Sequence, residues 1–187
     1  MKHPQRILLA VAAAWLLAGC QGKVSASHRI NDVKEILTPA QVDTVLGRPG
    51  HYVDPGGSPS LMQNILDQST ISRAEYQTND TPIRFLKVRL IHKPTPANAA
   101  VKEYFFVKDD FSSLPGLEPL VVTGVGEECA GYTSDEGKNL RLVARNQDLI
   151  VSLHIRGEGT PANQMDTLKE MANHLLSAGE DKKAANP

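Results

Sequence analysis

The sequence predicts one α+β domain, in which an antiparallel sheet of about five or six strands packs with about three helices. Three observations lead to this prediction. Apolar and polar residues alternate along several central segments, which is the spacing of half-buried strands. Three other segments carry apolar residues at helical spacing, and the predicted order is helix, hairpin, helix, strands, helix. The length of 187 residues fits a single domain.

Each predicted helix begins behind the same local signal, a Thr-Pro-Ala sequence at Thr38, Thr95 and Thr160. A Thr side chain accepts a hydrogen bond from a free backbone N–H of the first turn, and proline suits the first helical position. In the first copy, Gln41 completes a capping box. No longer repeat follows the signal, so it indicates cap chemistry and not a duplicated fold.

The apolar spacing predicts where these helices end. The first stops at Gly47, the second runs to about Phe106, and the third ends at Gly179. A further short helix is predicted to begin in residues 60–63.

Strands are predicted for the remaining patterned segments, and short polar turns between them indicate hairpins. Polar side chains alternate with the apolar ones, which is typical of an antiparallel sheet with one face partly in water. The predicted strands are Ser72–Thr78, Ile83–His92, Glu118–Thr123, Cys129–Ser134, Asn139–Asn146 and Leu149–Arg156.

The N-terminus has the pattern of an export signal, with a basic start at Lys2 and Arg6 followed by an uncharged run over 7–17. Eleven residues are too few to cross a bilayer as a helix, which needs about 20. The run ends in Leu-Ala-Gly-Cys at Cys20, which resembles the lipobox of bacterial lipoproteins. The resemblance implies cleavage before Cys20 and attachment of lipid to its thiol. The alternative is an ordinary secreted protein whose cleavage site ends in Cys.

The lipobox implies an anchor in the membrane, since two or more acyl chains hold a protein stably. Gln21 stands where aspartate would resemble the inner-membrane retention signal, so in a Gram-negative host we expect the periplasmic side of the outer membrane. The predicted organisation is a signal peptide at 1–19, a lipidated Cys and tether at 20–31, the α+β domain at 32–179 and a disordered tail at 180–187.

Several motifs of the folded part resemble small bacterial envelope lipoproteins, largely uncharacterised, with a sensor-type, PsbP-like domain. They are Leu-Thr-Pro-Ala-Gln at 37–41, Leu-Gly at 46–47, Val-Gly-Glu-Glu at 125–128, and a hairpin before a final helix. This resemblance implies an α+β fold and a non-catalytic accessory role at membrane-bound complexes. The family often has a Cys in the first hairpin that can pair with a later one, and this sequence lacks it.

Cys129 is the only thiol besides Cys20. As a nucleophile it would need His154 as base and Asp135 or Glu128 to orient that base, which would make a cysteine hydrolase. No nucleophile motif surrounds Cys129, so a small packed strand residue is the competing interpretation.

Other chemistry is not indicated by the sequence. No two of His28, His51, His92, His154 and His174 have a helical metal-ligand spacing, so we predict no metal site and no cofactor. The glycine-rich pieces at 55–58 and 124–126 lack the residues of a phosphate-binding loop and are predicted to be turns. The net charge of −1 argues against nucleic acid as a partner.

One group of charges suggests a site. If the apolar alternates of the strands face the core, six basic side chains share the opposite face of the sheet, where they could bind an anionic partner. The alternative is a solvated face whose charges discourage aggregation. The six residues are Lys87, Arg89, Arg141, Arg145, His154 and Arg156.

The sequence therefore predicts a membrane-anchored, non-catalytic accessory or binding domain of the cell envelope, with an envelope protein or anionic ligand as partner. Two alternatives remain open at this stage. One is the Cys129-dependent hydrolase, and the other is a carrier that shields an apolar ligand between the sheet and the helices.

Overall fold

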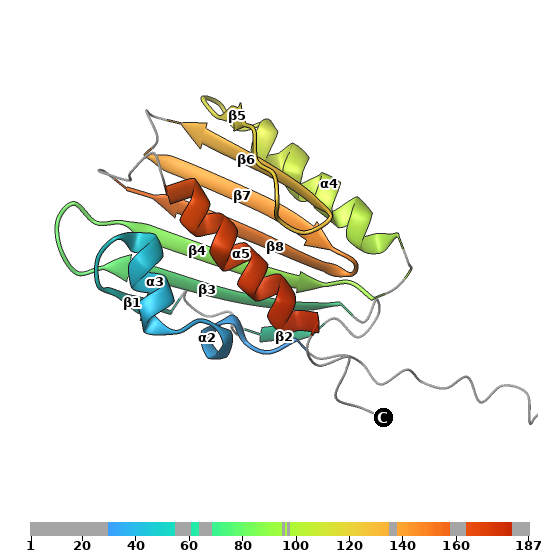
Figure 1. Ribbon diagram of the computed structural model, residues 1–187, viewed down its shortest axis with the longest axis horizontal. Coiled ribbons are helices and arrows are strands. Elements are labelled where there is room, and N and C mark those ends of the chain that lie inside the picture. The colour runs from blue at the N-terminus through green and yellow to red at the C-terminus, as the bar shows by residue number, and fades with distance from the viewer. Residues whose placement is uncertain are drawn as a thin grey trace, which may run out of the picture.

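A computed structural model describes residues 30–54, 61–63, 69–94, 96, 98–134, 138–157 and 164–180. One antiparallel sheet runs through the molecule, and helices α2, α3 and α5 lie across the face nearest the viewer in Figure 1. Helix α4 packs on the other face, over strands β6, β7 and β8. The predicted α+β class is confirmed, with eight strands instead of five or six and four helices instead of three in this part of the chain.

The described helices are α2 (Val33–Ile36), α3 (Pro39–Leu46), α4 (Ala99–Ser112) and α5 (Gln164–Glu180). Helix α3 follows the sequence prediction closely. The Thr38 hydroxyl accepts from the Gln41 backbone N–H at 3.3 Å, and the Gln41 side chain accepts from the Thr38 N–H at 2.9 Å. Gly47 ends the helix in the left-handed conformation at φ 69°, which glycine adopts without strain.

The two longer helices differ from their predictions. Helix α4 begins at Ala99 and ends at Ser112, beyond the predicted end at Phe106, because Val107 and Phe111 continue its buried stripe. Gly179 lies inside α5, so the predicted stop there is wrong. The predicted caps Thr95 and Thr160 lie outside the described residues.

The strand order is β1-β3-β4-β8-β7-β6-β5, with β2 pairing β3 beside β1. Neighbouring strands are antiparallel throughout, including the central pairs that join β4 to β8 and β8 to β7. The strands are β1 (Gly50–Val53), β2 (Leu61–Gln63), β3 (Thr70–Thr78), β4 (Phe85–His92), β5 (Glu118–Leu120), β6 (Glu128–Ser134), β7 (Asn139–Asn146) and β8 (Leu149–Arg156).

The two unpredicted strands are both short and lie at one edge. β2 occupies residues expected to begin a helix, and that expectation is wrong because these residues pair with 70–72 of β3. β1 pairs with 75–78 of the same strand and is largely exposed, so it has no apolar alternation to reveal it. Both strands form because the nine-residue strand β3 has backbone groups available for pairing along the side that β4 does not occupy.

Two apolar clusters hold the layers together. The larger one fills the space between the sheet and helices α2, α3 and α5, with fully buried side chains such as Leu86, Leu153 and Leu175. The smaller one joins α4 to the opposite face, where Tyr104, Val107 and Phe111 pack among residues that include Ile91, Val143 and Ile150. The sheet therefore has one fully covered face and one partly covered face.

The folded part already includes Ile30, which is buried in the larger cluster, so the predicted tether at 20–31 overlaps the domain at its end. No helix in the described residues is both long enough and apolar enough to span a membrane.

Candidate functional site

Helix α4 covers only one end of its face of the sheet, and the register defines what lies beside it. The pair Ile91 and Ile150 on β4 and β8 belongs to the cluster under α4. Two residues further along, Arg89 pairs with Ser152, and after another two, Lys87 pairs with His154. Charged side chains thus begin where the helix stops covering the sheet.

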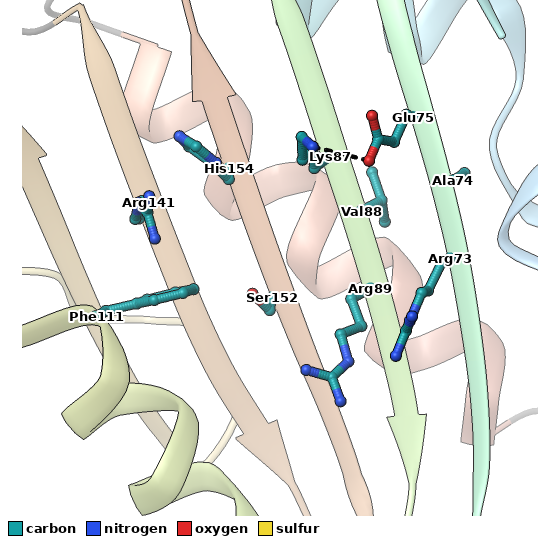
Figure 2. A pocket seen from close by; sticks show the side chains of 10 residues that line it. All are labelled: Arg73, Ala74, Glu75, Lys87, Val88, Arg89, Phe111, Arg141, Ser152 and His154. Atoms are coloured by element: carbon teal, nitrogen blue, oxygen red, sulfur yellow. Dashed lines mark ion pairs between the residues drawn. The ribbon is translucent and has the colours of Figure 1, made fainter. Parts of the chain in front are cut away.

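This open end is hollowed into two adjoining pockets of about 390 and 470 Å³. We call them together the cationic groove. The two pockets share Glu75, Lys87, Arg141 and His154, so they adjoin, and Figure 2 shows the residues that line the first of them. The groove is lined by the side chains of Arg73, Glu75, Phe85, Lys87, Arg89, Phe111, Arg141, Ser152, His154 and Arg156, together with Ala74 and Val88.

The positive charge of the groove is only partly compensated. Lys87 Nζ lies 2.9 Å from Glu75 Oε1. Arg89 Nη2 lies 3.9 Å from Glu103, whose other oxygen binds Lys93 at 3.1 Å. Among the described residues, the three remaining cations of the groove have no ion pair; they are Arg73, Arg141 and Arg156.

Packing against an aromatic ring holds Arg141 in place. The Arg141 guanidinium lies 4.9 Å from the centroid of the Phe111 ring, which in turn meets Tyr132 edge to face at 6.2 Å. A cation over an aromatic face is stabilised without being neutralised. The Nε atoms of Arg73, Arg89 and Arg141 are buried and have no hydrogen-bond partner among the described residues. One N–H donor on each of these three guanidinium groups is therefore unpaired within the described part of the chain.

Burial and electrostatic repulsion together keep one member of the groove, His154, neutral at pH 7. Burial, and after it the cations Arg141, Lys87 and Arg156, lower the pKa of His154 from 6.5 to about 4. Burial and then Arg73 lower the pKa of Arg89, while Glu103 and Asp110 act in the opposite direction. Burial also lowers the pKa of Arg141. An anion bound among these cations would raise each of these lowered pKa values.

The structure brings five of the six predicted cations together in the groove, namely Lys87, Arg89, Arg141, His154 and Arg156. It places Arg145 apart. Arg145 pairs in register with Ile150 at the covered end of the face and makes ion pairs of 2.8 Å with both Glu127 and Glu128. Its charge is therefore already neutralised.

Sequence reasoning missed two charged residues of the groove, Arg73 and Glu75. Both lie on β3 and face Arg89 and Lys87 across the β3–β4 pair. The signal was present, because the alternation along this strand puts Arg73 and Glu75 on the side opposite its apolar residues.

The arrangement required for a cysteine hydrolase is absent from the described residues. Cys129 donates its S–H to the Val122 carbonyl at 3.3 Å and packs against the larger core cluster, beside α5. His154 lies in the groove, on the opposite face of the sheet. A Cys129–His154 pair is therefore wrong. Glu128 binds Arg145, and Asp135 lies outside the described residues.

The remaining motifs have structural roles where they can be seen. Gly124 and Gly126 adopt positive φ values of 82° and 56° in the turn predicted for them, and a Cβ on Gly126 would collide with the Arg145 carbonyl oxygen. The described residues contain no group of three or more His, Cys, Asp or Glu side chains able to hold a metal. Cys20, Gln21, His28 and residues 55–58 lie outside the described residues.

Comparison with known proteins identifies the fold. No family model matches the chain, and no curated protein matches its sequence. Among solved structures, the chain is similar to the extracellular domain of PknH from Mycobacterium tuberculosis, with a TM-score of 0.55 and 11% sequence identity. The match covers 82% of this chain and 99% of that one. Likeness at this identity shows a shared α+β architecture.

Proposed function

We propose that the chain is an exported, membrane-anchored and non-catalytic domain that binds an anionic ligand in the cationic groove. The ligand is either a free anion or an acidic group of an envelope protein, which present the same chemistry to the groove. The likeness to an extracellular domain supports a place outside the cytoplasm, and the lipobox-like sequence at Cys20 supports the anchor.

The observation that carries this proposal is a local excess of charge. The groove contains five Lys and Arg side chains against one Glu, although the whole chain has a net charge of −1. Clustered cations on low-dielectric walls concentrate positive potential and attract anions. Like charges held this close together raise the free energy of the folded protein. An anion bound among them lowers that free energy and so stabilises the fold.

The competing interpretation, a merely solvated strand face, fits this geometry less well. Solvated cations on a strand stand singly on an exposed surface, whereas Arg73, Arg89 and Arg141 bury their Nε atoms in a hollow. The apolar-ligand carrier fits less well, because fully buried leucines such as Leu86, Leu90 and Leu142 fill the centre of the layer between sheet and helices. A hollow of about 410 Å³ at the edge of this layer, beside α3 and β1, is lined by Lys34 and His51 as well as by apolar side chains.

Calorimetric titration of the purified mature protein with sulfate, at constant ionic strength, tests anion binding. We expect saturable binding that Arg141→Gln weakens by about tenfold, since a hydrogen bond to a charged group contributes roughly 1.5 kcal/mol or more. Lys169→Gln is the matched control, because Lys169 lies on α5 over the other face and pairs with Asp166. The proposal is overturned if sulfate does not bind, or if both variants bind it as the wild type does.

Mass spectrometry of the protein purified from its own membrane tests the anchor. We expect a chain that begins at Cys20 and carries fatty acyl groups, and a Cys20→Ser variant that leaves the membrane fraction. An intact leader, or a trimmed chain without fatty acid, would contradict this part of the proposal.

A further inference from the structure

The cations of the groove form two groups at different levels of the sheet. Arg73 and Arg89 face each other across β3 and β4 and make up the first group. The second group has Lys87, His154 and Arg141 side by side on β4, β8 and β7, with Arg156 two residues beyond His154. In Figure 2, Arg73 and Arg89 extend toward one end of the view, while Arg141, His154 and Lys87 lie toward the other.

Electrostatic repulsion follows the same division. Burial, and after it Arg73, lowers the pKa of Arg89 within the first group, while Glu103 and Asp110 oppose that change. Burial, and after it the cations of the second group, lowers the pKa of His154. Each group therefore contains cations that repel one another, although Glu103 lies 3.9 Å from Arg89 and Glu75 pairs with Lys87 at 2.9 Å.

A single hollow connects the two groups. The pocket of about 390 Å³ is lined by Arg73 and Arg89 and also by Lys87, Arg141 and His154. Along a strand the two groups are about 7 Å apart, since each residue advances about 3.4 Å. Arg141 also lies two strands away from Arg89, which adds about 10 Å across the sheet. A compact anion such as sulfate is too small to bridge this separation.

Resting on the proposed anion-binding function, we infer that the groove takes an elongated ligand with an anionic group at each end. One end binds between Arg73 and Arg89, and the other binds within the second group. The connecting part passes the Ser152 hydroxyl and the Phe111 ring, which also line the hollow. The ligand class is thus a dicarboxylate or a bisphosphate with an extended, weakly polar spacer.

Calorimetry with ligands of graded length tests the inference. We expect octanedioate to bind at least about tenfold more tightly than octanoate, which has one carboxylate, and than butanedioate, which is too short to span the groups. The alkanediol bisphosphate of the same length distinguishes the two head groups, because the preferred one binds more tightly.

Variants of the first group separate this inference from the proposed function. Arg73→Gln should weaken octanedioate binding by about tenfold and octanoate binding by less, because octanoate can still place its one carboxylate in the second group. Arg89→Gln, on the neighbouring strand, should act in the same way and guards against a folding defect of one variant. Lys169→Gln should change neither affinity.

Two results would overturn the two-ended ligand while the proposed function stands: octanoate binding as tightly as octanedioate, or Arg73→Gln and Arg89→Gln weakening octanoate and octanedioate equally. Failure of the wild type to bind sulfate would instead remove the anion-binding function itself.

Discussion

The two faces of the sheet use the same strands for different purposes. Toward α2, α3 and α5, the strands present side chains such as Leu86, Leu142 and Leu153, which are fully buried in one continuous cluster. Toward α4, the same strands present Lys87, Arg141 and others that remain only partly buried around a hollow. Since adjacent residues of a strand point to opposite faces, stability and recognition are encoded in alternating positions. The comparison teaches that one face can be charged because the other supplies the core.

The largest effect is expected on the covered face. Leu153→Ala should lower the free energy of unfolding by about 3 kcal/mol, because it removes buried methyl groups and leaves a cavity among fully buried neighbours. Chemical denaturation measures this loss. Sulfate affinity of the folded variant should stay the same, and a loss of binding comparable to that of Arg141→Gln would break the division between the faces.

A smaller effect comes from the pH dependence of His154. Its pKa is about 4 in the folded protein and about 6.5 in the unfolded chain, so between these values the unfolded chain binds a proton that the folded one does not. The stability contribution present above pH 6.5 is therefore lost as the pH falls toward 4. We expect a loss of about 2 kcal/mol, allowing for solvent screening.

The control for this prediction is His154→Gln, which cannot titrate. The stability difference between wild type and variant should change between pH 6.5 and 4 and stay constant below pH 4. A difference that does not vary with pH would show that burial and the surrounding cations do not lower the pKa of His154.

The cap of α3 offers an effect smaller again. Thr38→Ala removes the side chain that accepts from the Gln41 N–H, and it should cost about 1 kcal/mol of unfolding free energy. Thr38→Ser keeps the hydroxyl and should cost much less. Equal losses in the two variants would show that the cap is not what the Thr contributes.

The smallest effect on stability is expected in the groove itself. Arg73→Gln should change the free energy of unfolding by less than about 0.5 kcal/mol, because it also removes repulsion with Arg89. Denaturation in the absence of added anion measures this. A loss as large as that of Leu153→Ala would mean that the groove is a structural element.

The sequence predicts the central strands well because their periodicity is strong. β4, β7 and β8 alternate clearly over the half that borders the groove and lose the alternation only where three buried residues follow one another, so the position and the inward faces of these strands follow from the pattern. β1 and β2 are set by pairing with the edge of β3, which no local pattern records. The end of α4 likewise depends on tertiary packing, because Phe111 near the end of the helix packs against Tyr132 of β6.

The site was predictable to the extent that it depends on alternation. Five cations share a face because each occupies an outward position of its strand, but their neighbours depend on the strand order. Arg145 shares that alternation but is not part of the groove. It lies at the end of the face that helix α4 covers, and it forms ion pairs with Glu127 and Glu128. Arg73 lay within a predicted strand, and its place beside Arg89 required the β3–β4 register.

The titration of His154 followed by NMR, with and without saturating sulfate at equal ionic strength, tests the central claim most directly. Sulfate keeps its charge over this pH range, so a change reports the site and not the ligand. An anion bound among Lys87, Arg141 and Arg156 should raise the pKa of His154 from about 4 toward its ordinary value of 6.5. Identical titration of His154 in both solutions would contradict an anion site in the cationic groove.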